Sequence, residues 1–334
     1  MAPKAHLLSL LLPRAPIPTR RLLLSISLPT FFATATMSTT TTSPPTYPIR
    51  PLPAPPSSLS PPREPLPRID ETNDSDFYSQ PRFVTHIDDA AISRLRDYYH
   101  WNLWDGAPEN SGSGSSREGK KNKKRSRILD LCTSWVSHFP KDMETLAVST
   151  ARDQGHEAHP SDEELEVIGL GMNEAELNAN PILSHRILQD LNTEPKITLP
   201  PSNSSSSSSS SSTLDATTCV VSIDYLTHPL TVLRSIHALT RPQGSIHLVV
   251  SNRCFPTKVA GEWLRVSEEE RLEMVGRYLW WSGWEGVEVV DLCEKGGKAM
   301  GMLERVFGAG AGDPLWVVRG VKGGGGGGVG RTEL

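Results

Sequence analysis

Residues 128–131 read Ile-Leu-Asp-Leu, a short apolar run with one acid inside it. A run of this length between polar segments predicts a strand that is buried on both faces of a sheet. Working outward along the chain, six further apolar or β-branched runs predict strands, at 165–170, 185–191, 216–223, 245–250, 287–292 and 315–318.

Helices are predicted between these strands. From Asp88 to Tyr99 the apolar residues share one helical face, and two aspartates open the segment where the helix dipole favours negative charge. LTVLRSIHAL (230–239) is a second amphipathic segment, and the Pro and Gly at 242 and 244 end it. Ser267 begins a third helix, with Glu270 in the capping-box position. Weaker helical signals lie at 135–139 and 173–177.

Strands that alternate with helices predict right-handed crossovers. The expected fold is therefore a single α/β domain with a doubly wound, mainly parallel, seven-stranded sheet of Rossmann-like type. A ligand is expected at the carboxyl ends of the strands, where the strand order reverses.

Low-complexity stretches interrupt this pattern. Hydrophobic residues make up only 37% of the chain, whereas a folded domain typically has about 45–50%. Stretches of Ser, Thr, Pro or Gly bury too little surface to offset the entropy lost on ordering. We expect a disordered targeting and linker segment at 1–70, one domain at 71–322 with flexible insertions at 106–127 and 200–213, and a Gly-rich tail at 323–334.

The first 63 residues contain no Asp or Glu, while Lys and Arg are scattered among Leu, Ser and Thr. This composition is typical of a transit peptide and favours a mitochondrial location. A secretory signal is the rival interpretation, but its apolar region, 6–12, is short and is followed at once by Pro13 and Arg14. A second start at Met37 would omit the targeting segment and give a cytoplasmic form.

Charge and composition disfavour several other classes. The net charge is −4, and the basic cluster 120–125 lies in a Gly/Ser stretch without interleaved aromatic residues, so no nucleic-acid partner is expected. No run approaches the ~18–20 apolar residues of a membrane span. The four cysteines are not near neighbours in sequence, so neither a zinc knuckle nor a CxxC redox pair is predicted, and no metal site is expected.

Five stretches, taken in order, resemble the class I S-adenosylmethionine-dependent methyltransferase superfamily, in particular its type 11 kind. They are 128–131, 167–169, 189–192, 219–222 and 239–244. LDLCTSWVSHFP at 129–140 and SNRCFPTKVAGEW at 251–263 resemble a narrower branch with an LDLCTSWVSH-type first motif. The resemblance implies the Rossmann-like methyltransferase fold, S-adenosyl-L-methionine as cofactor, and a small-molecule or unknown methyl acceptor.

The resemblance also implies a set of cofactor-binding positions. It assigns adenine recognition to Asp190, and Gly171 stands where a ribose-binding acid is usual, with Asn173 nearby as a substitute. Cys132, Ser134 and Val136 stand where three glycines are usual. The implied cofactor-binding residues are Asp130, Cys132, Ser134, Gly169, Gly171, Asn173, Asp190, Leu191 and Ser222.

The interpretations of single residues remain open at this point. Asp190 could instead cap the loop at Asn192 and Thr193. Asp224, Tyr225 and Asn252 are the candidate catalytic residues, because they follow two predicted strands at the edge where a substrate would bind. Turns beside those strands would explain the same residues without any catalytic role.

Three functions are compatible with these features. The first is a methyltransferase, which needs in-line positioning of the reacting groups more than a strong base. The second is a catalytically inactive binding module with the same fold, favoured by the missing glycines and the missing ribose acid. The third, an NAD-type Rossmann oxidoreductase, is disfavoured because no G-x-G-x-x-G follows the first strand.

Residues 1–36 are predicted to direct import into mitochondria, because this acid-free start combines Arg with Leu and Ser. The measurement is the location of a fluorescent protein fused to residues 1–60. A fusion that stays diffuse in the cytosol would show the prediction to be wrong.

Overall fold

The computed structural model describes residues 45–104, 124–152, 163–201, 213–293 and 312–324. The predicted targeting segment, most of both predicted insertions and most of the Gly-rich tail lie outside the described residues.

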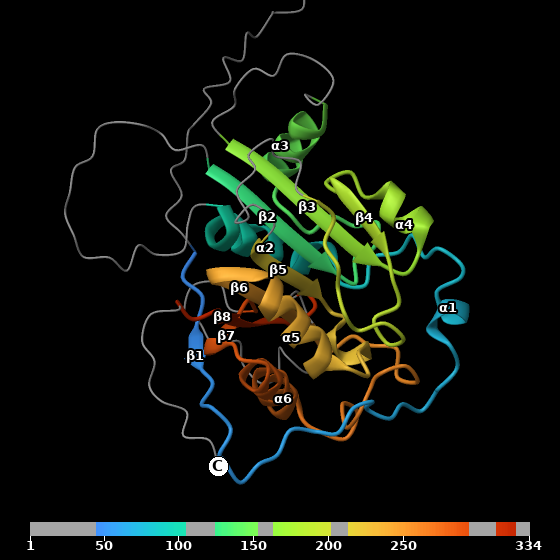
Figure 1. Ribbon diagram of the computed structural model, residues 1–334, viewed down its shortest axis with the longest axis vertical. Helices are drawn as coiled ribbons and strands as arrows, with labels where there is room; N and C mark the ends of the chain where they lie inside the picture. Colours follow the sequence, from blue (N-terminus) through green and yellow to red (C-terminus); the bar gives the residue numbers. More distant parts are fainter. Residues whose placement is uncertain (1–44, 105–123, 153–162, 202–212, 294–311, 325–334) are drawn as a thin grey trace, which may run out of the picture. The chain divides into compact units, whose positions relative to one another are not determined.

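The core of the domain is one mixed sheet in the order β1-β7-β8-β6-β5-β2-β3-β4 (Figure 1). Neighbouring strands from β6 through β5, β2 and β3 to β4 pair in parallel, whereas the pairs β6–β8, β8–β7 and β7–β1 are antiparallel. The strands are β1 (Ile49–Pro51), β2 (Lys124–Leu131), β3 (Glu163–Gly171), β4 (His185–Leu188), β5 (Leu214–Val220), β6 (Thr240–Ser251), β7 (Glu285–Asp291) and β8 (Leu315–Val321). The α/β prediction is confirmed, but the sheet has eight strands instead of seven.

Helices bury the sheet from both sides. Alternate residues of the parallel strands face opposite directions, so β2 places Leu129 and Leu131 in one apolar cluster and Ile128 in another. The first cluster packs against α5 and α6, and the second packs against α2 and α3. The helices are α1 (Asp74–Phe77), α2 (Asp89–Tyr99), α3 (Lys141–Arg152), α4 (Glu174–Ala179), α5 (Pro229–Leu239) and α6 (Glu268–Trp281), with short helical turns η1 (His100–Trp104) and η4 (Ile223–Tyr225).

Most elements begin and end near their predicted bounds, but β6 begins already at Thr240, through the predicted turn at 242–244, and β5 ends at Val220 instead of residue 223. Three further differences follow. The helical signal at 135–139 is a loop, and α3 begins only at Lys141, after Pro140. The third predicted strand ends at Leu188, so Gln189–Leu191 belong to the following loop. Residues 124–127, assigned by sequence to a flexible insertion, form the start of β2, and the Arg127 side chain is buried.

Residues 45–70 are the main departure from the expected linker. Tyr47, Leu52 and Leu66 are buried in the two apolar clusters. β1 adds the eighth strand by pairing with β7, and the Trp280 indole N–H donates to the Leu52 carbonyl oxygen at 3.1 Å. The linker prediction failed because a segment rich in Pro has no periodic pattern, although its few apolar residues meet a surface that is complete only in the folded domain.

Glu64 caps helix α5 from this same segment. The helix starts at Pro229, and its N-cap residue, His228, makes no side-chain capping bond. The Glu64 carboxylate accepts instead from the Leu230 N–H at 2.5 Å and from the Thr231 hydroxyl at 2.6 Å. A negative charge at this position also matches the helix dipole.

Glu64→Ala is therefore expected to lower the free energy of unfolding by about 1–2 kcal/mol, as loss of a helix N-cap typically does. Urea denaturation of the full chain measures the effect. The control is Arg63→Ala, which changes an exposed neighbour. Equal destabilisation by the two substitutions would contradict the capping role.

Candidate functional site

A cavity of about 360 Å³ opens at the carboxyl ends of β2, β3 and β5 and is also lined by the loop that follows β4. β2 lies between β3 and β5 in the sheet, so the chain winds in opposite directions on its two sides. This is the switch point at which open α/β sheets bind ligands. The ligand position expected from sequence therefore coincides with a cavity.

The loop after β2 passes directly over the end of β3. The Thr133 N–H donates to the Leu170 carbonyl at 2.7 Å, and a Cβ atom on Gly171 would overlap the Thr133 carbonyl oxygen. Gly171 lines the cavity, but no side chain can be placed there without moving the loop. The usual strand-end acid is thus sterically excluded from this position.

The residue that follows each of the two central strands, β2 and β5, has a left-handed backbone conformation. Cys132, which follows β2, has φ 55°, and Val221, which follows β5, has φ 42°. Non-glycine residues rarely adopt this region, and a β-branched valine does so only under constraint, at a cost on the order of 1–3 kcal/mol. Both residues line the cavity. Cys132 therefore has the backbone conformation that glycine would adopt more easily, although it carries a side chain.

Asp130 lines the cavity from the end of β2 and is buried. One carboxylate oxygen accepts from the Thr218 hydroxyl at 2.7 Å, and burial raises the pKa of Asp130 to about 6. The Thr133 hydroxyl donates to the backbone carbonyl of Asp130 and so ties the β2 loop to its own strand.

Asp190 lines the cavity from the loop after β4, and it is half-buried. Its carboxylate accepts from the Asn192 N–H at 2.9 Å, so the loop-capping role considered for this residue is present. The same carboxylate borders the cavity and is available for a ligand. Leu191 is buried beside it in the core and also contributes to the cavity wall.

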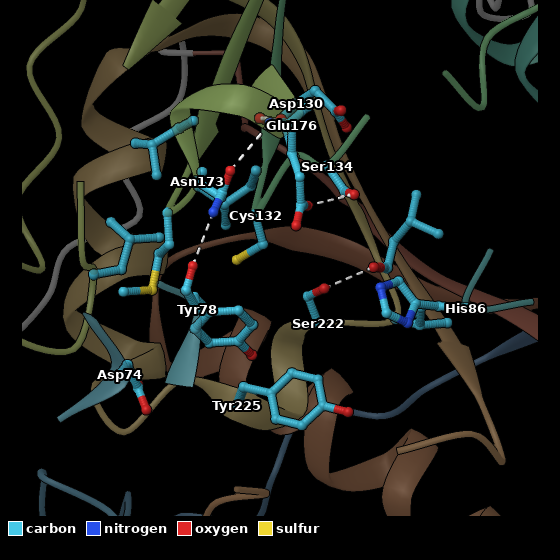
Figure 2. Close-up of a pocket in the computed structure, with 18 of the residues that line it drawn as sticks. Asp74, Tyr78, His86, Asp130, Cys132, Ser134, Asn173, Glu176, Ser222 and Tyr225 are labelled. Atoms are coloured by element: carbon cyan, nitrogen blue, oxygen red, sulfur yellow. Dashed lines mark hydrogen bonds between the residues drawn. The ribbon is translucent and has the colours of Figure 1, made fainter. Parts of the chain in front are cut away.

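Two of the implied cofactor-binding residues have structural roles instead. Gly169 does not line the described cavity, and its missing side chain makes room for Leu183. Asn173 reaches the cavity but uses both ends of its amide: its oxygen caps α4 at the Glu176 N–H, and its nitrogen donates to the Tyr78 carbonyl at 3.0 Å (Figure 2).

The three catalytic candidates have different surroundings. Tyr225 lines the cavity, but its hydroxyl accepts from the Phe255 N–H at 2.8 Å, and burial raises the pKa of the phenol. Asn252 is exposed and does not line this cavity, so its contact with a substrate stays a prediction. Asp224 is buried behind the cavity wall, with one carboxylate oxygen lacking a hydrogen-bond partner.

Ser222 borders the cavity as implied, and its hydroxyl donates to the Val220 carbonyl at 2.8 Å. Ser134 also borders the cavity, and its hydroxyl donates to the Glu176 carboxylate at 2.8 Å (Figure 2).

Sequence reasoning missed the wall formed by the N-terminal segment. Asp74, Tyr78 and His86 all line the cavity (Figure 2). Burial alone would raise the pKa of Asp74, but hydrogen bonds from Arg68 and Asn192 outweigh it and hold that pKa below its usual range. The two Arg68 bonds are 2.9 and 2.7 Å long.

Lys258 completes this buried cluster from the loop after β6. Its ammonium lies 3.2 Å from Asp74 and donates to the Thr72 carbonyl at 2.7 Å. No local sequence signal could reveal this wall, because Asn192 is 118 residues from Asp74 and Lys258 is 186 residues from Thr72.

At the sequence level, no family model matches the chain, and no curated protein matches it. Solved structures give distant similarities. One is the apo S-adenosylmethionine-dependent methyltransferase SibL, at 14% identity and TM-score 0.33 over 60% of this chain and 51% of SibL. A second is an S-adenosylmethionine-dependent methyltransferase from Mesorhizobium loti, at 15% identity and TM-score 0.35 over 60% of this chain and 93% of that one.

A third similar structure is phosphoethanolamine N-methyltransferase 2 of Haemonchus contortus in complex with S-adenosyl-L-methionine. It is 12% identical, with a TM-score of 0.37 over 76% of this chain and 60% of that one. Because these similarities are weak, we base the functional proposal on the strand order and the cavity. In the described residues, no helix is long and apolar enough to cross a membrane.

Burial raises the pKa of Asp224 to about 8. The pH dependence of stability therefore tests whether this carboxyl group is buried. Between the unfolded value near 3.8 and this value, the folded protein keeps a proton that the unfolded chain releases. Stability from this group therefore falls as pH rises through that window, by about 1.4 kcal/mol per pH unit, and levels off above it. Asp224→Asn, which cannot ionise, should lack this fall.

Urea denaturation of wild type and Asp224→Asn at pH 5.5, 6.5 and 7.5 provides the measurement. The difference between their unfolding free energies should change in favour of the variant as pH rises. Parallel pH profiles would contradict a buried, neutral Asp224.

Proposed function

We propose that the chain is an S-adenosylmethionine-dependent methyltransferase. The main support for this proposal is the cavity at the carboxyl ends of β2, β3 and β5. It lies where the strand order reverses, and carboxylates line it. Its volume of about 360 Å³ lies within the roughly 300–1,000 Å³ range of small-molecule sites.

The donors and acceptors around this cavity fit the cofactor. A half-buried carboxylate, Asp190, can accept from the exocyclic amine of an adenine. The left-handed turn at Cys132 lets the backbone after β2 come close to a ligand above the sheet. Tyr78 and Tyr225 offer aromatic surface on the side of the cavity opposite Ser134 (Figure 2).

When bound, the cofactor supplies an electrophilic methyl group. The chain's own part is to hold an acceptor in line with that group and to take up a proton from acceptors that release one. His86 suits the second task, because it lines the cavity and burial lowers its pKa, so its imidazole is neutral near pH 7. The Tyr225 phenol stays protonated and holds the Phe255 backbone, so it serves to position that loop.

One specific observation favours the second candidate, a binding module without catalysis. Neither position that the resemblance assigns to the ribose offers an acid. A side chain at Gly171 would overlap the Thr133 carbonyl oxygen, and the Asn173 amide is hydrogen-bonded to the Glu176 N–H and the Tyr78 carbonyl. A chain that binds the cofactor but transfers no methyl group to any acceptor would favour this candidate.

Asp190→Ala is expected to weaken S-adenosylmethionine binding by about 10- to 100-fold. Losing a charge-assisted hydrogen bond costs roughly 1.5–3 kcal/mol, which corresponds to that range of dissociation constants. Isothermal titration calorimetry on the full chain measures it.

Two variants sharpen this test. Asp190→Asn keeps an oxygen for the Asn192 N–H, so a loss of affinity there reports the ligand contact instead of a disturbed loop. Glu194→Ala removes an exposed carboxylate from the same loop and should bind as wild type does. Wild-type affinity in Asp190→Ala would contradict the assignment of adenine to this loop, and failure of wild type to bind would contradict the proposed function.

Ser134→Gly would place a glycine in the β2 loop, where the resemblance implies one. The Ser134 hydroxyl donates to Glu176, however, so this substitution also removes a hydrogen bond at the cavity rim.

A further inference from the structure

We infer that Glu176 of helix α4 is the carboxylate that binds the ribose hydroxyls of the nucleoside, in place of the acid that the end of β3 lacks. This assignment rests on the proposed function, because it concerns the same cavity and the same ligand. It adds a specificity-determining residue that sequence reasoning did not single out.

The end of β3 cannot supply this carboxylate itself. At Gly171 any side chain meets the Thr133 carbonyl oxygen. At Asn173 the amide oxygen accepts from the Glu176 N–H, and the amide nitrogen donates to the Tyr78 carbonyl. Neither of these two positions therefore presents a carboxylate to a ribose.

Glu176 is free of the role that its position would ordinarily give it. Asn173 is the N-cap of α4, so Glu176 is the third helical residue. In a capping box the side chain at this position reaches back to the N-cap backbone N–H, as Glu270 does in α6. Glu176 instead extends to Ser134 and to the Arg82 N–H, at 2.8 and 2.6 Å.

The Glu176 carboxylate keeps charge and acceptor capacity on the cavity rim. Two carboxylate oxygens accept about four hydrogen bonds, and the two described bonds use one on each oxygen. The nearby Arg82 guanidinium lies over the Phe77 ring, 4.1 Å from its centre, and donates to the Phe77 carbonyl. Among the described residues, no lysine or arginine side chain pairs with Glu176. A vicinal diol supplies the two donors that such a carboxylate lacks.

The placement of Glu176 also suits the order of groups in a nucleoside. α4 follows β3, and the Asp190 loop follows β4, the strand paired with β3. Both carboxylates line the one cavity. A ligand whose adenine meets Asp190 therefore has its ribose toward the β3 side, where Glu176 and Ser134 meet.

The test is calorimetry of the full chain with S-adenosylhomocysteine, which has the same nucleoside but no transferable methyl group, and with its 2′-deoxy and 3′-deoxy forms. Wild type should bind at least one deoxy form about 10-fold more weakly, because a charge-assisted bond is lost. Glu176→Gln should weaken binding of the parent ligand by about 10- to 100-fold and bind the deoxy forms with less than about 3-fold further loss.

Glu174→Gln is the matched control. It removes an exposed carboxylate from the same first turn of α4, so it changes the helix dipole interaction equally and should keep wild-type affinities. If thermal unfolding shows that Glu176→Gln is not folded, Glu176→Asp, which shortens the side chain but keeps its charge, is measured in the same way and should reduce the discrimination.

The outcomes separate this assignment from the function on which it rests. Binding by wild type that Glu176→Gln leaves unchanged overturns the assignment alone. So does a weakening that is equal for parent and deoxy ligands, since Glu176 would then act away from the ribose. No binding of S-adenosylhomocysteine by wild type overturns the proposed function and the assignment together.

Discussion

The close crossing of the β2 loop over the end of β3 constrains the rest of the site. Thr133 bonds to Leu170 through its N–H and blocks the space above Gly171 with its carbonyl. This crossing requires a glycine at position 171 and the left-handed turn at Cys132. It also leaves the strand end without a polar side chain that could contact a ligand. Apart from Asp130 of β2, the charged groups of the cavity are supplied by the loops and helices around it.

The N-terminal segment supplies a large share of those groups. Its Asp74 is neutralised by Arg68 and Lys258, and Asn192 joins it to the loop after β4. A buried carboxylate with several donors around it is costly to disturb, because removing one partner leaves the other charge unpaired. The cluster therefore fixes the wall of the cavity more rigidly than the scarcity of secondary structure in this segment suggests.

Sequence patterns predicted the fold well where the signal is local. The apolar run at 128–131 is the core of β2, and Ser267 with Glu270 forms the predicted capping box of α6. The patterns failed where the decisive contact is distant in sequence. Residues 45–70 contain too few apolar positions to show a period, yet Leu52 and Leu66 complete the core.

The site residues, too, were predictable where the sequence signal is local and not where the contacts are distant in sequence. Asp130 near the end of β2, Cys132 just after it and Asp190 after β4 all line the cavity. Glu176 stood one turn beyond the expected acid and looked like part of a helix start, so only its three-dimensional contacts distinguish it. Asn252 was predicted from its position after a strand, but it is exposed and does not line the cavity.

The pairing of β1 with β7 has a consequence for how the polypeptide acquires its shape during synthesis. Ile49 pairs with Val290, and Glu64 caps a helix that begins at Pro229. Residues 49 and 64 thus leave the ribosome well before their partners are made, and contacts of such long sequence separation form slowly. The parallel strands between them can assemble earlier, as a nascent sheet that still lacks β7 and β8. Every residue that lines the cavity lies between Asp74 and Phe255, so a nascent chain stalled before β7 would hold the whole pocket lining but no strand for β1 to pair with.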